Sequence, residues 1–184
     1  MGIFNHDEQN DLPDKDTPAY AVRQFGTART NLLIAIAFTA VNMILGLIGS
    51  EVYFLFSITL PYALCDPEVG GVAIAVAVVV LAFYVCCYLF SKKKPGWMIA
   101  ALVAFCVDCL LLVVFALLGI AASKGEISLV DILIDVLAHV WVLVYLIIGV
   151  RYCRRYRDAV ETGDADAQIV TDMSAEDAEE GKIE

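Results

Sequence analysis

The sequence predicts an all-α polytopic membrane protein, a bundle of four transmembrane helices with a short interfacial or re-entrant segment on its outer face. Three observations predict this class: an apolar composition, four long apolar stretches, and the placement of the basic residues. Of the 184 residues, 60% are hydrophobic and 18% are charged, and the mean hydropathy is +0.76. A soluble domain of this length has too little interior to bury so much apolar surface. We therefore expect lipid to surround most of the chain.

Four apolar stretches are long enough to cross the hydrocarbon core of a bilayer, which takes about 20 residues. They are residues 31–49, 70–90, 96–122 and 128–150, and none has a proline in its interior. Each is therefore predicted to be one transmembrane helix, and together they form a transmembrane domain over residues 31–150.

A fifth apolar run, residues 53–65, is shorter and contains Pro61, so the basic residues decide whether it spans. Loops on the cytoplasmic side of a membrane are enriched in Lys and Arg. With four spans, the three basic groups of the chain fall on one side, whereas a fifth span would divide them. These groups are Arg23 and Arg29, then Lys92, Lys93 and Lys94, then Arg151, Arg154, Arg155 and Arg157. Both termini are thus predicted to be cytoplasmic, and residues 53–65 to be interfacial or re-entrant.

The two ends of the chain carry its acidic character. Residues 1–30 are predicted to be an acidic cytoplasmic tail with a juxtamembrane lead-in, in which residues 18–30 form a short helix lying on the membrane. Residues 151–184 are predicted to be a basic juxtamembrane stretch and then a disordered acidic tail. The net charge is −10, and no basic stripe with interleaved aromatic residues exists, so nucleic acid is not an expected partner.

Several polar residues lie at depths where lipid would surround them. Asp108 is near the middle of the third span, and Asn42 near the middle of the first. Asp131, Asp135 and His139 share one face of the fourth span, at spacings of four.

Intramembrane ionisable residues usually mark functional sites, so these residues predict a pathway for protons, cations or a small solute. In this hypothesis Asp108 pairs with His139, Asn42 bridges them, and Asp131 and Asp135 line an outward vestibule. The alternative is that they serve only as hydrogen bonds between helices, with Asp131 placed at a helix start.

Other site chemistry has less support in the sequence. Cys106 and Cys109 form a C-x-x-C within the third span and, with Asp108 and His139, are weak candidates for a metal site, because there is no second Cys or His pair. No catalytic motif or cofactor-binding motif occurs, so an enzyme is not expected. An intramembrane aspartyl protease using Asp108 and Asp135 is the one enzymatic alternative, but the residues that flank them do not match that family's motifs.

One segment carries a resemblance. Residues 28–64 contain R-T-N-L-L, then Y-F-L-F-S, then P-Y, and resemble a pattern in small multi-span membrane proteins of Gram-positive bacteria that have no assigned function. The resemblance covers about a fifth of the chain. It implies a bacterial cytoplasmic membrane and a membrane-embedded fold, and it transfers no catalytic or binding residue.

Two functions remain open. The first is a small transporter or channel, which with only four spans is expected to be a homo-oligomer. The second is a non-catalytic membrane partner or assembly factor for another membrane complex, because small residues on the spans permit close helix packing and acidic tails are typical interaction segments.

Overall fold

The computed structural model describes residues 17–50, 52, 54, 56–65, 70–122 and 129–163. The regular structure in these ranges is helical: α1 Pro18–Leu47, α2 Thr59–Ala63, α3 Gly71–Phe90, α4 Gly96–Ala122 and α5 Leu129–Thr162. All of these helices except α2 are long and apolar enough to cross a membrane. The predicted fold class, an all-α membrane protein with four spanning helices, is confirmed.

Large apolar side chains cover the outside of the bundle. Leu110 on α4 is 68% exposed and Leu137 on α5 is 59% exposed, and α3 presents a row of exposed valines. Such a surface cannot face water over this area, whereas lipid is a solvent for it. The interior is also apolar, and Phe25, Leu32, Tyr84, Met98, Phe105 and Leu146 are among its largest buried side chains.

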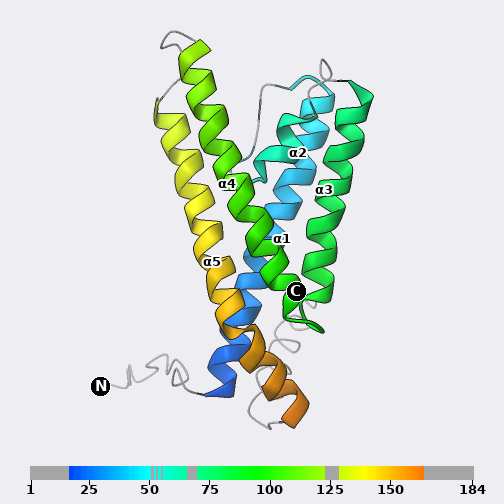
Figure 1. Cartoon of the computed structure of the whole chain (residues 1–184), viewed down its shortest axis with the longest axis vertical. Helices are drawn as coiled ribbons and strands as arrows, with labels where there is room; N and C mark the ends of the chain where they lie inside the picture. The colour runs from blue at the N-terminus through cyan, green and yellow to red at the C-terminus, as the bar shows by residue number, and fades with distance from the viewer. Residues whose placement is uncertain are drawn as a thin grey trace, which may run out of the picture.

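The four long helices converge at one end of the molecule and diverge toward the other (Figure 1). The start of α1, the turn between α3 and α4, and the end of α5 all lie at the convergent end. The most extensive packing between any two described helices is that of α1 with α5. In the divergent half, α2 lies between the long helices and contacts α1, α3 and α4.

Helix α1 begins much earlier than the predicted first span. Thr17 caps its N-terminus by accepting a hydrogen bond from the Tyr20 N–H (3.3 Å), and Pro18 occupies the first helical position, where no N–H is needed. The prediction that residues 18–30 form a separate helix lying on the membrane is wrong. They are the first turns of α1, because Ala21, Phe25 and other residues of that segment bury one face against α5.

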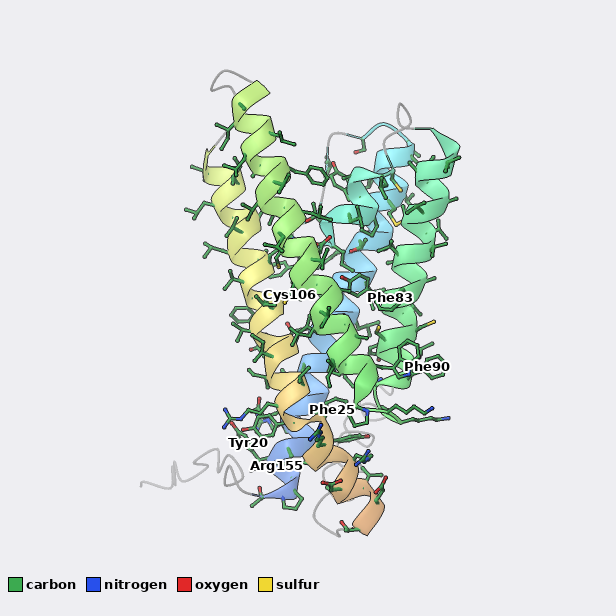
Figure 2. The ribbon with its side chains drawn as sticks, viewed as in Figure 1. Tyr20, Phe25, Phe83, Phe90, Cys106 and Arg155 are labelled. Atoms are coloured by element: carbon green, nitrogen blue, oxygen red, sulfur yellow. The ribbon has the colours of Figure 1, made fainter. Side chains whose placement is uncertain are left out.

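Helix α5 likewise continues 12 residues beyond the predicted end of the fourth span, to Thr162. Its last turns pack on the first turns of α1: Phe25 stacks on Tyr156 with ring centroids 4.5 Å apart, and Tyr20 meets Tyr152 edge-on at 5.6 Å. Figure 2 shows Tyr20 and Phe25 gathered at this convergent end. The paired helical segments, here called the α1–α5 stalk (residues 18–30 and 151–162), contain the predicted lead-in and most of the predicted basic stretch. The predicted acidic tails, residues 1–16 and 164–184, lie outside the described residues.

Arg29 joins α1 to the end of α3. Its Nε donates to Ser91 Oγ (3.1 Å), its Nη2 donates to the Tyr88 carbonyl (3.0 Å), and its guanidinium lies 4.5 Å from the centre of the Tyr88 ring. A cation at this position stabilises the negative end of the helix dipole and satisfies a terminal carbonyl. This basic residue therefore fixes the convergent end of the bundle.

Candidate functional site

Residues 56–65 turn back inside the bundle and carry the short helix α2. Phe56 has a φ of 65°, in the left-handed region that residues other than glycine seldom adopt, and it marks the turn. Ile58 and Pro61 are buried, and α2 contacts three of the long helices. The segment thus enters the bundle, as the re-entrant alternative predicts.

Asp108 of α4 binds the start of α2. The first N–H groups of a helix have no partner within it, and no side chain of the segment caps α2. The Asp108 carboxylate accepts hydrogen bonds from the first two N–H groups of α2. Oδ2 accepts from the Thr59 N–H (2.9 Å), and Oδ1 accepts from the Leu60 N–H (2.8 Å). These two hydrogen bonds attach the start of α2 to α4 and satisfy main-chain N–H groups that the helix itself leaves without a partner.

Two polar residues of α1 bind the chain that leads into α2. The Asn42 side chain donates to the Phe54 carbonyl and accepts from the Phe54 N–H, both at 2.7 Å. Thr39 Oγ1 accepts from the Ile58 N–H (2.7 Å) while donating to the Ala35 carbonyl (2.6 Å). Lipid offers no partner for non-helical backbone, so protein side chains must supply one. Asn42, Thr39 and Asp108 do so for the entering segment.

His139 of α5 lies beside the Asp108 carboxylate. Its Nδ1 is 2.9 Å from the Asp135 carbonyl, and because a carbonyl only accepts, Nδ1 carries a proton. Its Nε2 is 3.0 Å from Thr59 Oγ1 and 3.5 Å from Asp108 Oδ2. The neutral ring accepts from the Thr59 hydroxyl, whereas the imidazolium would donate from Nε2 and be paired with Asp108. His139 therefore links α5 to α2 and lies against the Asp108 carboxylate of α4.

Asp135 differs from Asp108 in having no hydrogen-bond donor on its carboxylate among the described residues. Its closest charged or ionisable partner is His139 Nδ1, 3.9 Å from Oδ1, and that nitrogen already donates to the Asp135 carbonyl. The Asp135 side chain is 24% exposed, compared with 3% for Asp108. It faces a cavity instead.

The cavity beside Asp135 has a volume of about 330 Å³ and lies among α2, α4 and α5. Its polar lining comes from Asp135, His139, Ser57, Thr59 and Tyr62. The apolar lining consists of Ala63, Leu112, Phe115, Ala116 and Ile132. These positions lie in the divergent half of the bundle, so the cavity is nearer to the end opposite the α1–α5 stalk. We call it the Asp135 cavity.

A second cavity, of about 420 Å³, opens between α3 and α4. Its walls are almost wholly apolar, with Leu60, Val79, Phe83, Val107 and Leu111 among them. The Asp108 carboxylate also borders it, but both oxygens of that group are bound to α2. The Asp135 cavity differs in that no described residue donates a hydrogen bond to the carboxylate that borders it.

No protein-family model, curated protein or solved structure matches this chain. The resemblance of residues 28–64 to small multi-span proteins of Gram-positive bacteria therefore stays a prediction. What this chain does must be argued from its own residues.

The structure brings together only part of the predicted polar cluster. Asp108 and His139 are adjacent, as their depths predicted, and Asp135 lies one turn from His139. The bridging role predicted for Asn42 is wrong, because its amide is occupied by Phe54. Asp131 lies one turn before Asp135 on α5, and its side chain is outside the described residues.

The two alternatives that used other chemistry find no support. Cys106 is on the exposed face of α4 and Cys109 is half-buried, and within the described ranges no three His, Cys, Asp or Glu side chains gather as metal ligands. An aspartyl protease needs two carboxylates that share a water molecule, whereas both oxygens of Asp108 are bound to main-chain N–H groups.

Sequence reasoning missed the residues that the entering segment contributes: Ser57, Thr59 and Tyr62. A signal was present, since two hydroxyl residues and Pro61 interrupt an otherwise apolar run. Thr39 and Asn42 were a second signal, because their spacing of three places both on one face of α1. Neither signal says which backbone groups the side chains bind.

Proposed function

We propose that this protein is a small membrane transporter or channel that takes a proton, a cation or a small solute into the Asp135 cavity. One observation carries the proposal: a carboxylate within the spans faces a cavity and has no hydrogen-bond donor in the described part of the chain. Among the described residues its nearest ionisable neighbour is His139 at 3.9 Å, and a charge so weakly paired at this depth costs several kcal/mol in desolvation unless a cation or a proton offsets it. Asp108, which has a structural role, accepts two main-chain hydrogen bonds, whereas no described residue donates a hydrogen bond to the Asp135 carboxylate.

His139 supports a pathway rather than a closed pocket. It touches the cavity on one side and Asp108 on the other, and histidine gains and loses protons near neutral pH. The His139 nitrogen that can accept a proton is Nε2, beside Thr59 Oγ1 and Asp108 Oδ2, because Nδ1 already donates to the Asp135 carbonyl. Four spanning helices are few for a complete pathway, so we propose that two or more copies assemble in the membrane.

Flux in proteoliposomes tests the proposal. Purified protein is reconstituted, and uptake of protons and of alkali cations is followed with fluorescent indicators. We expect flux above that of protein-free liposomes, and a loss of about tenfold or more in Asp135→Asn, which corresponds to ~1.4 kcal/mol or more at the site. Asp158→Asn is the matched control, because Asp158 is 66% exposed on the stalk. Equal flux in Asp135→Asn and the original protein contradicts the proposal.

We place the protein in a bacterial cytoplasmic membrane with both ends of the chain in the cytoplasm. The support is that Lys92–Lys94 and the arginines of residues 151–157 belong to one end of the bundle, together with the start of α1. In this orientation the Asp135 cavity opens in the outer half of the bilayer. A reporter fused to residue 184 that is protected from external protease in intact cells agrees with this orientation, and a cleaved reporter contradicts it.

A second function, that of a non-catalytic partner of another membrane complex, is favoured by the stalk. Helices of 30 and 34 residues are roughly 45 and 51 Å long, which exceeds the hydrocarbon core of roughly 30 Å. The stalk therefore presents helical surface beyond the bilayer, where a protein can dock. Purification from native membranes in mild detergent decides between the two: a stoichiometric foreign subunit supports this second function, and a homo-oligomer supports transport.

A further inference from the structure

We propose that the solute of the Asp135 cavity is an amphiphilic organic ammonium ion, with its charged nitrogen at the Asp135 carboxylate and its apolar part against α4. This inference rests on the proposed function and names its substrate class. It follows from the composition of the cavity wall, which combines the Asp135 carboxylate, to which no described residue donates a hydrogen bond, with a largely apolar lining.

The charges around the cavity select a cation. Asp135 contributes a carboxylate, and no Lys or Arg is among the residues that line the cavity. His139 is the only other ionisable side chain of the lining besides Tyr62, and its Nδ1 is committed to the Asp135 carbonyl. An anion would meet the Asp135 charge without a compensating partner, so the cavity disfavours it.

The ligands around the cavity disfavour a bare metal ion. Hard cations such as Mg²⁺ and Ca²⁺ take six or more oxygen ligands, several of them carboxylates. Within the described residues no three acidic, His or Cys side chains are arranged so that they could hold a metal ion. One carboxylate is too little to replace the hydration shell of such an ion.

The apolar wall suits the rest of an organic cation. Leu112, Phe115 and Ala116 form the α4 side of the cavity, with Ile132 on α5 and Ala63 on α2. Burial of apolar ligand surface against such a wall is favourable by about 25 cal/mol per Å². The rings of Phe115 and Tyr62 also border the space, and aromatic faces attract ammonium groups. A cavity of about 330 Å³ lies within the range of small-molecule sites.

Calorimetric titration of the purified protein in detergent tests the assignment with two probes. Benzyltrimethylammonium carries the charge and the apolar ring, and benzyl alcohol carries the ring alone. We expect benzyltrimethylammonium to bind the original protein more tightly than benzyl alcohol does. In Asp135→Asn its affinity should fall tenfold or more while that of benzyl alcohol stays the same. Asn keeps the size of the side chain, so this comparison isolates the charge.

A second pair of variants tests the location of the probe. Ala116→Phe fills the cavity and should abolish binding of both probes, whereas Ala82→Phe, on the exposed face of α3, should bind them as the original protein does. The inference is overturned if benzyltrimethylammonium does not bind, or if it binds equally to Asp135→Asn. If Asp135-dependent flux of protons or alkali cations is nevertheless measured, the proposed function stands and only the substrate class is wrong.

Discussion

At the scale of single residues, Asp108 and Asp135 show how surroundings give one side chain two roles. Both are aspartates within spanning helices, and both lie near His139. Asp108 accepts two main-chain N–H bonds and is 3% exposed, so its charge is used to hold α2. Asp135 has no such donor and faces the cavity. We therefore expect loss of the first charge to affect stability and loss of the second to affect solute binding.

Thermal unfolding in detergent separates these roles. In Asp108→Asn, an NH₂ group replaces one accepting oxygen and leaves a main-chain N–H of α2 without an acceptor. The cost of an unsatisfied buried donor is about 1–3 kcal/mol, so we expect a lower unfolding midpoint. Asp135→Asn removes no accepted hydrogen bond and should unfold within ~0.5 kcal/mol of the original protein, as should the exposed Asp158→Asn. An equal loss of stability in Asp108→Asn and Asp135→Asn contradicts the division of roles.

The sequence predicts well how deep a polar residue lies in the membrane, but it does not predict which group the side chain binds. Counting along the third and fourth spans placed Asp108 and His139 at one level, and they are neighbours. The same count placed Asn42 near them, but Asn42 turns to Phe54 instead. The backbone of the entering segment supplies donors and acceptors that no hydropathy profile shows, because only the folded path of residues 54–60 brings them to those side chains.

At the scale of helices, the contact of α1 with α5 depends on Gly149. A Cβ added at Gly149 would lie 2.9 Å from the Ala28 Cβ and 3.1 Å from the Met98 Cε. The Met98 side chain can move, but the Ala28 Cβ is fixed to the α1 backbone. A larger residue at Gly149 therefore forces α1 and α5 apart.

Two glycine-to-alanine variants are expected to change the stability of the protein in opposite directions. We expect Gly149→Ala to lower the stability of the detergent-solubilised protein by about 1–3 kcal/mol, the usual cost of overpacking. Gly26→Ala, in the same helix pair but with nothing within 4 Å of the new Cβ, should raise it by about 0.5–1 kcal/mol because alanine is the better helix former. Unfolding midpoints measured side by side give both values. A rise in both variants would show that α1 and α5 are not closely packed at Gly149.

The four long helices were predictable from the sequence, but the start of α1 and the end of α5 were not. The ends of the predicted third span coincide with α4, since charged and glycine residues mark both of its boundaries. Helices α1 and α5 run past their apolar stretches because Phe25 and Tyr156 bury each other outside the spans. A hydropathy profile cannot show this, because the polar residues of the stalk lower its mean hydropathy whether or not its aromatic side chains are in contact.

At the scale of the whole molecule, the divergence of the long helices makes room for the site. The stalk and Arg29 hold the helices together at one end, and at the other the entering segment lies between them. The Asp135 cavity lies beside that segment. Charge placement predicted the number of spans and left residues 53–65 as interfacial or re-entrant. The cavity depends on how far the helices separate, and only tertiary packing fixes that distance.

The central claim is that the Asp135 cavity admits water and solute within the spans, and labelling of an introduced thiol tests it most directly. Ala116 lines the cavity, and Ala82 lies on the lipid-facing side of α3. Membrane vesicles with Ala116→Cys or Ala82→Cys are treated with a charged maleimide, with the original protein as the background for its six cysteines. Labelling of Ala116→Cys above that background, with Ala82→Cys at background, is the predicted result. Equal labelling of the two variants in membranes, when both react fully after denaturation, would contradict the account.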